Sequence, residues 1–368
     1  MKKILLLIII IVGFTQLYSQ KKFTNYIEVK NTPVKNQQRT GTCWSFATAS
    51  FLESEILRLK NKTIDLSEMY EVRNIYEDKA LNYFLRQGKT NFSEGGLAHD
   101  FIRAMAINGV VPQTVYPGNP KGETVLNHAE ISSILEAYVK AIVKSRQHTD
   151  YWKEGFDAVL DVYFGKKPDN FMYDDKEFTP GSFAEYLGLN PENYIELTSF
   201  THHPFKKYFV LEIPDNYSSG MYYNIELQKL KEQTDYALEN GYSVCWDGDV
   251  SEAGFGRRTG EIDIEEDFNG VFDGNQQDYG LIANLRQSQF EQLKTTDDHL
   301  MHIVGKAKDN TGRKFYIVKN SWGNSGEHDG YYYMSEKYFL LKTISIMIHK
   351  NALMTDVKPV FYLPDAIY

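Results

Sequence analysis

Residues 33–46 read P-V-K-N-Q-Q-R-T-G-T-C-W-S-F, and an apolar helical pattern begins inside this stretch at Cys43. The pattern continues through Phe51 and Leu57 to a charged end at Lys60. A thiol in the first turn of a buried helix faces unpaired backbone N–H groups and the positive end of the helix dipole. Both effects favour the thiolate, so the position suits a nucleophile. The alternative is a buried core cysteine, and the neighbouring residues argue against it.

The run from residue 33 to residue 46 resembles the active-site segment of papain-like cysteine peptidases. The resemblance implies that Gln37, six residues before Cys43, donates its side-chain amide to the oxyanion hole, with the backbone N–H of Cys43 as the second donor. Family members usually carry a second cysteine three residues before the nucleophile, where this chain has Thr40. That absence favours the branch of bleomycin hydrolase and aminopeptidase C.

Two histidines in the C-terminal part compete for the role of general base. Residues 297–305 read D-D-H-L-M-H-I-V-G and contain His299 and His302. Residues three apart in a strand point to opposite faces, so at most one of them can face the cysteine. The family pattern D-H-x-x-x-x-V-G matches Asp298 and His299. The resemblance therefore implies that His299 is the base, and His302 is expected on the opposite face as a structural residue.

The segment K-N-S-W-G at residues 319–323 resembles the third catalytic element of the family. The resemblance implies that the side-chain oxygen of Asn320 accepts a hydrogen bond from the imidazole and that the Trp322 ring covers this bond at the substrate cleft. A neutral amide fixes the ring without removing its charge, which would maintain a thiolate–imidazolium pair at neutral pH. Taken alone, Asn320 would be a turn residue after a strand.

Residues 93–117 predict a glycine turn, a helix and a Gly-Val-Val-Pro exit. In the peptidase family, paired glycines allow the substrate backbone to lie close to the protein, because only glycine permits that approach. This role is carried to Gly95 and Gly96. A turn that precedes a helix without any ligand is the alternative for the same residues.

Composition restricts the class of protein and its compartment. The formal charge of the 368-residue chain is -9, which disfavours a nucleic-acid partner. Residues 1–20 carry two lysines, then an apolar run from Ile4 to Phe14 that is too short to span a bilayer. They predict a signal peptide, with no membrane anchor after its cleavage and a periplasmic or extracellular protein. Of the two cysteines, Cys245 is expected to be a core residue.

The remaining chain, residues 21–368, is expected to form one papain-like α+β domain. A helical half would carry Cys43 and a β-barrel half would carry His299, with the active site in the cleft between them. A mainly helical insertion is expected near residues 121–200, and strands are expected at 241–247, 300–306, 315–319, 330–334 and 343–349. The acidic stretch 261–278 does not fit the spacing of a calcium loop and predicts a solvated loop.

The predicted activity is hydrolysis of peptide bonds through a thioester on Cys43, with peptides or proteins as substrates and no metal or cofactor. Aminopeptidase action is favoured over endopeptidase action. In the resembling branch the C-terminal residues lie in the cleft, and the tail Asp365–Tyr368 is a candidate for the same role. A catalytically inactive peptide-binding homologue and an acyltransferase remain alternatives. Oligomerisation, which occurs in this branch, stays open.

Overall fold

The computed structural model describes residues 22–264 and 278–359. The predicted signal peptide, most of the acidic stretch 261–278 and the C-terminal tail Asp365–Tyr368 lie outside the described residues. Within the described part of the chain, no helix is both long enough and apolar enough to cross a membrane.

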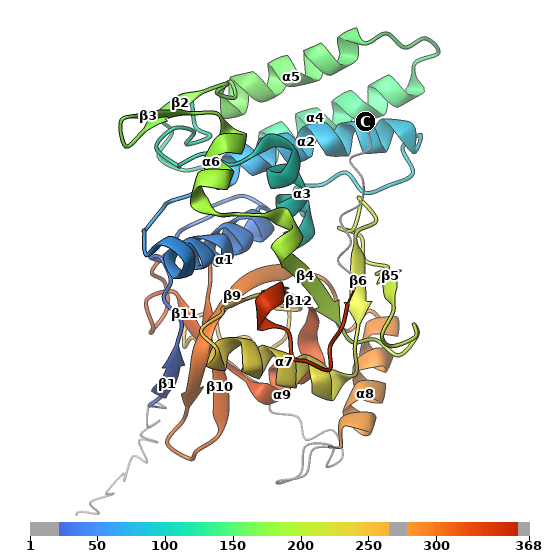
Figure 1. The fold of residues 1–368 in the computed structure, drawn as a ribbon. Coiled ribbons are helices and arrows are strands. Elements are labelled where there is room, and N and C mark those ends of the chain that lie inside the picture. The colour runs from blue at the N-terminus through green and yellow to red at the C-terminus, as the bar shows by residue number, and fades with distance from the viewer. Residues whose placement is uncertain (1–21, 265–277, 360–368) are drawn as a thin grey trace, which may run out of the picture.

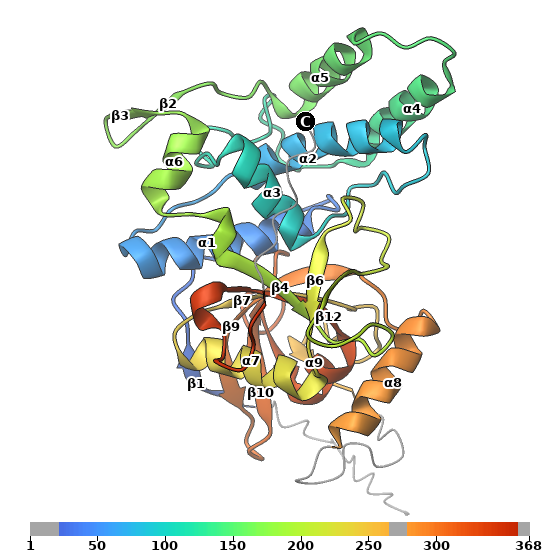
Figure 2. The ribbon, with the colours of Figure 1, turned by 45° about the vertical axis from the view of Figure 1, so that its right-hand side comes forward.

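The N-terminal half of the chain is mostly helical. It starts with strand β1 (Thr24–Glu28) and continues with helices whose bounds the structure gives as follows: α1 (Cys43–Lys60), α2 (Glu68–Leu85), α3 (Ala98–Asn108), α4 (Ala129–Lys144), α5 (Tyr151–Phe164) and α6 (Pro180–Leu187). A small hairpin of β2 (Phe171–Tyr173) and β3 (Lys176–Phe178) precedes α6. Figures 1 and 2 show α2 to α6 gathered above the sheet.

The predicted insertion near residues 121–200 corresponds to α4, α5, the hairpin and α6. It is helical as far as Leu187, after which a short 3-10 turn (Pro191–Asn193) leads into strand β4 (Tyr194–Thr198). Strand β4 lies inside the large sheet between two other strands, so the last part of the predicted insertion belongs to the β half.

The C-terminal half consists mainly of strands. Their bounds are β5 (Tyr208–Val210), β6 (Met221–Asn224), β7 (Val244–Gly248), β8 (Glu261–Ile262), β9 (His299–Lys308), β10 (Lys314–Lys319), β11 (Tyr331–Ser335) and β12 (Thr343–His349). Three helices accompany them: α7 (Leu227–Glu239), α8 (Tyr279–Glu291) and α9 (Glu336–Lys342). A 3-10 turn (Lys350–Ala352) follows β12. The five strands predicted from the sequence correspond to β7, β9, β10, β11 and β12.

The expectation of a closed β-barrel is not confirmed, because the sheet is open among the described residues. Its ten strands follow the order β5-β6-β4-β12-β7-β9-β10-β11-β8, with β1 added beside β9. The strands at the two ends, β5 and β8, are three and two residues long. Such short edges leave few unpaired backbone groups, so the sheet does not need closure to protect them.

Helix α1 lies between the two halves (Figure 1). Every residue from Trp44 to Ile56 is buried. A surface helix would expose one polar face to solvent, so α1 is a helix packed on all sides. Its Phe51 belongs to the core of the helical half. On the sheet side, Ser50 and Thr48 contact residues of β9 and β7. The N-terminus of α1, where Cys43 lies, is thereby fixed against the sheet.

Candidate active site

Cys43 is the first residue of α1 and is partly exposed. The carbonyl of Thr42 accepts hydrogen bonds from the backbone N–H groups of Ser45 (3.0 Å) and Phe46 (3.2 Å), which starts the helix. The thiol of Cys43 makes a hydrogen bond with the backbone of Leu300, the residue after His299. The helix N-terminus therefore brings the predicted nucleophile to the first residues of β9.

The predicted base and its orienting residue lie together at the start of β9. Nε2 of His299 is 2.8 Å from Oδ1 of Asn320, and the imidazole lies 4.9 Å from the Trp322 ring, centroid to centroid. An amide oxygen can only accept, so this contact assigns the proton to Nε2 and leaves Nδ1 as an acceptor. The ring is then in the tautomer that can take a proton from a thiol.

His302 occupies a different environment. Its Nδ1 is 2.8 Å from Oγ of Ser50, and its ring packs edge-on against Phe51, so it contacts the middle of α1. The side chain is fully buried, and burial lowers its pKa well below the usual value. His302 is therefore a neutral residue of the helix–sheet interface, while His299 is the histidine that contacts Asn320.

Gln37 is buried, and both ends of its amide have defined partners. Its Nε2 donates to the carbonyl of Thr40 at 2.7 Å, and its Oε1 accepts the hydroxyl hydrogen of Ser321 at 2.6 Å. A hydroxyl donor fixes the oxygen end of the amide, and one Nε2 hydrogen remains for another acceptor. This is the orientation that an oxyanion donor requires.

A short backbone pairing joins the segment before Cys43 to the segment after Asn320. The N–H of Gln37 donates to the carbonyl of Ser321 at 2.8 Å, and the N–H of Gly323 donates to the carbonyl of Lys35 at 2.9 Å. Asn36 and Trp322 form the antiparallel bridge between them. The predicted oxyanion donor and the predicted orienting residue are therefore held in one rigid unit.

Burial sets the protonation of the cysteine and the histidine. It raises the pKa of Cys43 to about 12, and the charges of Asp297, Asp215 and Asp247 contribute in the same direction. Burial also lowers the pKa of His299 to about 4, opposed by the hydrogen bond that its Nε2 donates to Asn320. Both shifts favour a neutral thiol and a neutral imidazole over the expected thiolate–imidazolium pair. Attack by sulfur then requires transfer of its proton to the imidazole.

The two glycines predicted to bind substrate backbone have close neighbours in the protein. A Cβ atom on Gly95 would overlap the carboxylate of Asp215, and one on Gly96 would lie 3.0 Å from the Trp44 ring. The Trp44 indole N–H also donates to the carbonyl of Glu94 at 3.0 Å. Glycine is therefore required here by the contacts with Asp215 and Trp44, whether or not a substrate also lies against this segment.

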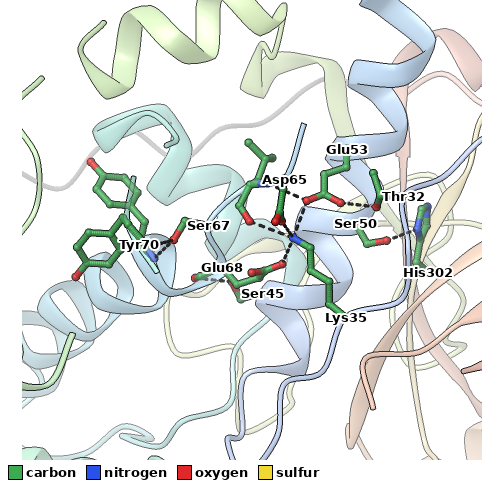
Figure 3. A network of polar contacts seen from close by, with 12 residues as sticks. Thr32, Lys35, Ser45, Ser50, Glu53, Asp65, Ser67, Glu68, Tyr70 and His302 are labelled. Carbon is green, nitrogen blue, oxygen red and sulfur yellow. Dashed lines mark hydrogen bonds and ion pairs between the residues drawn. The ribbon is translucent and has the colours of Figure 1, made fainter. Parts of the chain in front are cut away.

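A buried network of charged side chains contacts α1 through Glu53 (Figure 3). The ammonium of Lys35 contacts Glu53 at 2.8 Å, Glu68 at 2.6 Å and also Asp65. Thr32 joins this network to the sheet, because its hydroxyl donates to Glu53 and accepts from Lys319 of β10. The network connects the loop before Cys43, helix α1 and the sheet through charged hydrogen bonds.

Two clusters in the described ranges have side chains that a metal ion could use. One contains Glu53, Asp65 and Glu68, but the Lys35 ammonium already lies among its carboxylates. The other contains His202, His203 and Glu212, in which both imidazole Nε2 atoms contact the Glu212 carboxylate. Gln287 also donates to Nδ1 of His202, which assigns the His202 proton to Nε2 and favours hydrogen bonding over metal ligation.

Three features of the site were not predicted from the sequence. Ser321 lies inside the K-N-S-W-G motif, and its role could have been inferred from that position. Asp215 approaches Gly95 from a distant loop, and no local pattern marks it. Asp247 and Asp297 are hydrogen-bonded to one another, and their charges raise the pKa of Cys43. The D-D-H motif contains Asp297 but gives no indication of its partner.

The sequence and the fold match those of known peptidases. A model of the Peptidase C1-like family matches residues 157–366, and a model of the papain family cysteine protease matches residues 22–154. The first match spans more than half of the chain, so the protein belongs to the Peptidase C1-like family. It is a cysteine-type peptidase.

Curated relatives cover most of the chain at low identity. Aminopeptidase C of Lactobacillus delbrueckii subsp. lactis is 25% identical, with 91% of this chain and 83% of the relative covered. Aminopeptidase E of Lactobacillus helveticus is 27% identical, with 90% and 84% covered. The mitochondrial cysteine proteinase 1 of Saccharomyces cerevisiae is 24% identical, with 94% and 80% covered.

A solved structure shares the fold. The crystal structure of PepW from Lactobacillus rhamnosis HN001 superposes with a TM-score of 0.71 at 20% identity. The superposition covers 91% of this chain and 83% of the other chain.

Proposed function

We propose that this protein is an aminopeptidase that hydrolyses the peptide bond nearest a free N-terminus through a thioester on Cys43. The observation that carries the proposal is the meeting of the α1 N-terminus with the start of β9. There the Cys43 thiol contacts Leu300 while the neighbouring His299 contacts Asn320 at 2.8 Å. The relatives named aminopeptidase C and aminopeptidase E support the mode of cleavage.

In the proposed reaction the sulfur of Cys43 attacks the substrate carbonyl while its proton passes to Nδ1 of His299. The negative charge that develops on the carbonyl oxygen is stabilised by the backbone N–H of Cys43 and by the free Nε2 hydrogen of Gln37. One such donor contributes about 3–4 kcal/mol to the transition state. The imidazolium then protonates the leaving amine, and the neutral imidazole activates the water that hydrolyses the thioester.

The proposal is tested with matched peptides that carry a free or an acetylated N-terminus. We expect the wild-type protein to release N-terminal residues from the free peptides and to leave the acetylated ones intact, with Cys43→Ala as the inactive control. Internal cleavage of both sets would identify an endopeptidase. No cleavage, together with retained peptide binding, would identify an inactive homologue, and products joined to an added amine would identify an acyltransferase.

We also propose that the protein is exported and acts on peptides or proteins in the periplasm or outside the cell. The apolar run from Ile4 to Phe14 supports this location. Fractionation of cells that express the full chain, with and without residues 1–20, tests it. Light scattering on the same material measures the oligomeric state. The net charge of -9 disfavours a nucleic-acid partner.

A further inference from the structure

The connection between β7 and β8 places an arginine over the indole of Trp322. The guanidinium carbon of Arg257 lies 5.0 Å from the centre of the Trp322 ring. The same indole lies 4.9 Å from the imidazole of His299, centroid to centroid. A guanidinium at this distance from the face of an indole is attracted to it by a cation–π interaction. Trp322 therefore contacts both the proposed base and a cationic side chain from outside the catalytic motifs.

The backbone around Arg257 is fixed by hydrogen bonds. We call residues 255–260 the arginine loop. The N–H of Gly260 donates to the carbonyl of Gly256 at 2.8 Å, which closes a turn around Arg257. Tyr332 of β11 donates its hydroxyl hydrogen to the carbonyl of Arg257 at 3.2 Å. The arginine loop is thereby attached to the sheet, while the Arg257 side chain itself is exposed.

The guanidinium of Arg257 makes no ion pair with a carboxylate of the described ranges, and its contact is with the Trp322 ring. Acidic side chains of the same region have other partners. Glu327 pairs with the neighbouring Arg258 at 3.3 Å, and Asp298 accepts the hydroxyl hydrogen of Thr296 at 2.8 Å. A guanidinium carries five N–H donors and no acceptor, so an exposed one without a carboxylate is suited to an anionic ligand.

The charge of Arg257 also acts on the proposed base. Burial lowers the pKa of His299 to about 4, the hydrogen bond to Asn320 opposes this shift, and the positive charge of Arg257 lowers the pKa further. Removal of that charge should therefore raise the pKa of the imidazole. This effect gives a second measurement, independent of substrate charge, for the position of Arg257 at the site.

The proposed chemistry determines which part of a substrate passes Arg257. His299 protonates the leaving amine, so the part of the substrate after the scissile bond begins beside the imidazole and the Trp322 ring. Since the imidazole and the guanidinium each lie about 5 Å from the indole, they are at most about 10 Å apart, which an extended chain covers in about three residues. A carboxylate within the first three leaving residues would therefore reach Arg257.

We propose that Arg257 binds a carboxylate in the leaving part of the substrate, within the first three residues after the scissile bond. The carboxylate is the free C-terminus of a short peptide or the side chain of an aspartate or glutamate. A guanidinium matches both oxygens of a carboxylate, and its contact with Trp322 orients the planar group for that pairing. This inference rests on the proposed reaction of Cys43 and His299 and adds a class of preferred substrates to it.

The test uses two pairs of peptides that differ only in the charge of the leaving part. One pair ends two residues after the scissile bond, in a free carboxylate or in an amide. The other pair is longer, is amidated and carries glutamate or glutamine as the second leaving residue. We expect the wild-type protein to favour the charged member of a pair about three- to tenfold in kcat/KM, mainly through KM, as for an accessible ion pair. High salt should reduce this preference. The pair that shows it identifies the source of the carboxylate.

Arg257→Gln should abolish the preference and, on the amidated peptides, move the acidic limb of the rate profile to higher pH, because the charge that lowers the pKa of His299 is lost. Arg258→Gln is the matched control, since it removes the same charge from the same loop at a residue that already pairs with Glu327. It should keep the preference. Thermal unfolding and labelling of Cys43 with a thiol alkylator establish that each variant is folded with an accessible thiol.

The outcomes separate the inference from the proposed function. A wild-type protein that cleaves both pairs without preference contradicts the inference alone, and so does a preference that persists in Arg257→Gln. An equal loss of activity on charged and neutral peptides in a folded Arg257→Gln protein would show that Arg257 only supports Trp322. Internal cleavage of acetylated peptides would contradict the aminopeptidase proposal alone, because acetylated versions of the same two pairs still test Arg257.

Discussion

Ser321 donates its hydroxyl hydrogen to Oε1 of Gln37 across 2.6 Å, and this bond orients the amide that is the proposed oxyanion donor. The two residues lie in segments that also pair through the backbone bond from Gln37 N–H to the Ser321 carbonyl. The oxygen end of the amide is therefore held towards Ser321, and the nitrogen end is held towards Thr40 and the cleft. The roles of these two residues can be separated by substitution.

Gln37→Ala should lower kcat about 10²- to 10³-fold, because it removes an oxyanion donor that acts mainly in the transition state. Ser321→Ala should lower kcat only about fivefold, equivalent to about 1 kcal/mol for a lost orienting hydrogen bond. Steady-state kinetics on one free-N-terminus peptide measures both. Equal effects of the two substitutions would contradict a direct role for Gln37.

Cys43→Ala should abolish turnover and leave the fold intact, because a small side chain replaces a partly exposed thiol at a helix start. Loss of a nucleophile typically lowers the rate by several orders of magnitude. Peptide hydrolysis and thermal unfolding are measured on the same preparation. Cys245→Ala is the control, since it alters the other thiol. More than about one per cent residual activity in Cys43→Ala would contradict its assignment as nucleophile.

His299→Ala should be as damaging to turnover as Cys43→Ala, whereas His302→Ala should lower the free energy of unfolding and have a smaller effect on kcat. The reason is that His299 contacts Asn320 and His302 contacts Ser50 in the middle of α1. Kinetics and urea unfolding of both variants distinguish the two roles. An active His299→Ala protein with an inactive but stable His302→Ala protein would reverse the assignment.

Activity should fall at acidic pH as His299 gains a proton. The imidazole acts as a base only when it is neutral, and its pKa is lowered to about 4, so kcat/KM should decrease as the pH falls through about 4. The hydrogen bond that His299 donates to Asn320 raises this pKa, so Asn320→Ala should move the acidic limb to lower pH and also lower kcat. Rate profiles of both proteins test this. An unchanged acidic limb in Asn320→Ala would count against its contact with the base.

Lys35→Met should destabilise the protein by about 3–5 kcal/mol, because it leaves buried carboxylates without their cation. The pKa of Glu68 is raised to about 7 by burial, so the folded state binds a proton that the unfolded state has released between about pH 4.5 and 7. This group therefore reduces stability as the pH rises through that window. Without Lys35 the Glu68 pKa should rise further, so the destabilisation should be larger at pH 8 than at pH 5.

Urea unfolding at the two pH values measures this difference. Lys140→Met is the control, since its exposed pair with Glu136 should change stability by less than about 1 kcal/mol. A Lys35→Met protein with the same loss of stability at both pH values would show that the buried carboxylates are not coupled to the lysine.

The sequence predicted those parts of the molecule that local patterns encode. Cys43 follows a distinctive string and begins α1 where the apolar period begins, and Asn320 and Trp322 lie in one five-residue segment. The distinction between His299 and His302 depended on a spacing of three residues and on a family pattern. Each of these patterns lies within a few residues of the functional side chain that it indicates, so the sequence alone predicts that side chain.

The remaining features depend on residues that are distant in the chain. The position of Asp215 beside Gly95 arises from the path of the loop between β5 and β6, which no local period indicates. The raised pKa of Cys43 is a similar case, because burial and the carboxylates of Asp297, Asp215 and Asp247 raise it and no local pattern brings these three residues to Cys43. The open sheet ends in the short strands β5 and β8; an alternating pattern from Tyr208 marks β5, whereas the two residues of β8 give too weak a pattern to place.

The pairing of residues 35–37 with residues 321–323 has a consequence for biosynthesis. Gln37 and Ser321 are 284 residues apart in the chain, so the contact that orients the oxyanion donor can form only after nearly all of the polypeptide has been made. Contacts of such high sequence separation form late and slowly in folding. A nascent chain on the ribosome, or a product truncated before Asn320, would carry the thiol and His299 without the residues that orient His299 and Gln37. Proteolytic activity would therefore arise only after synthesis has passed residue 323.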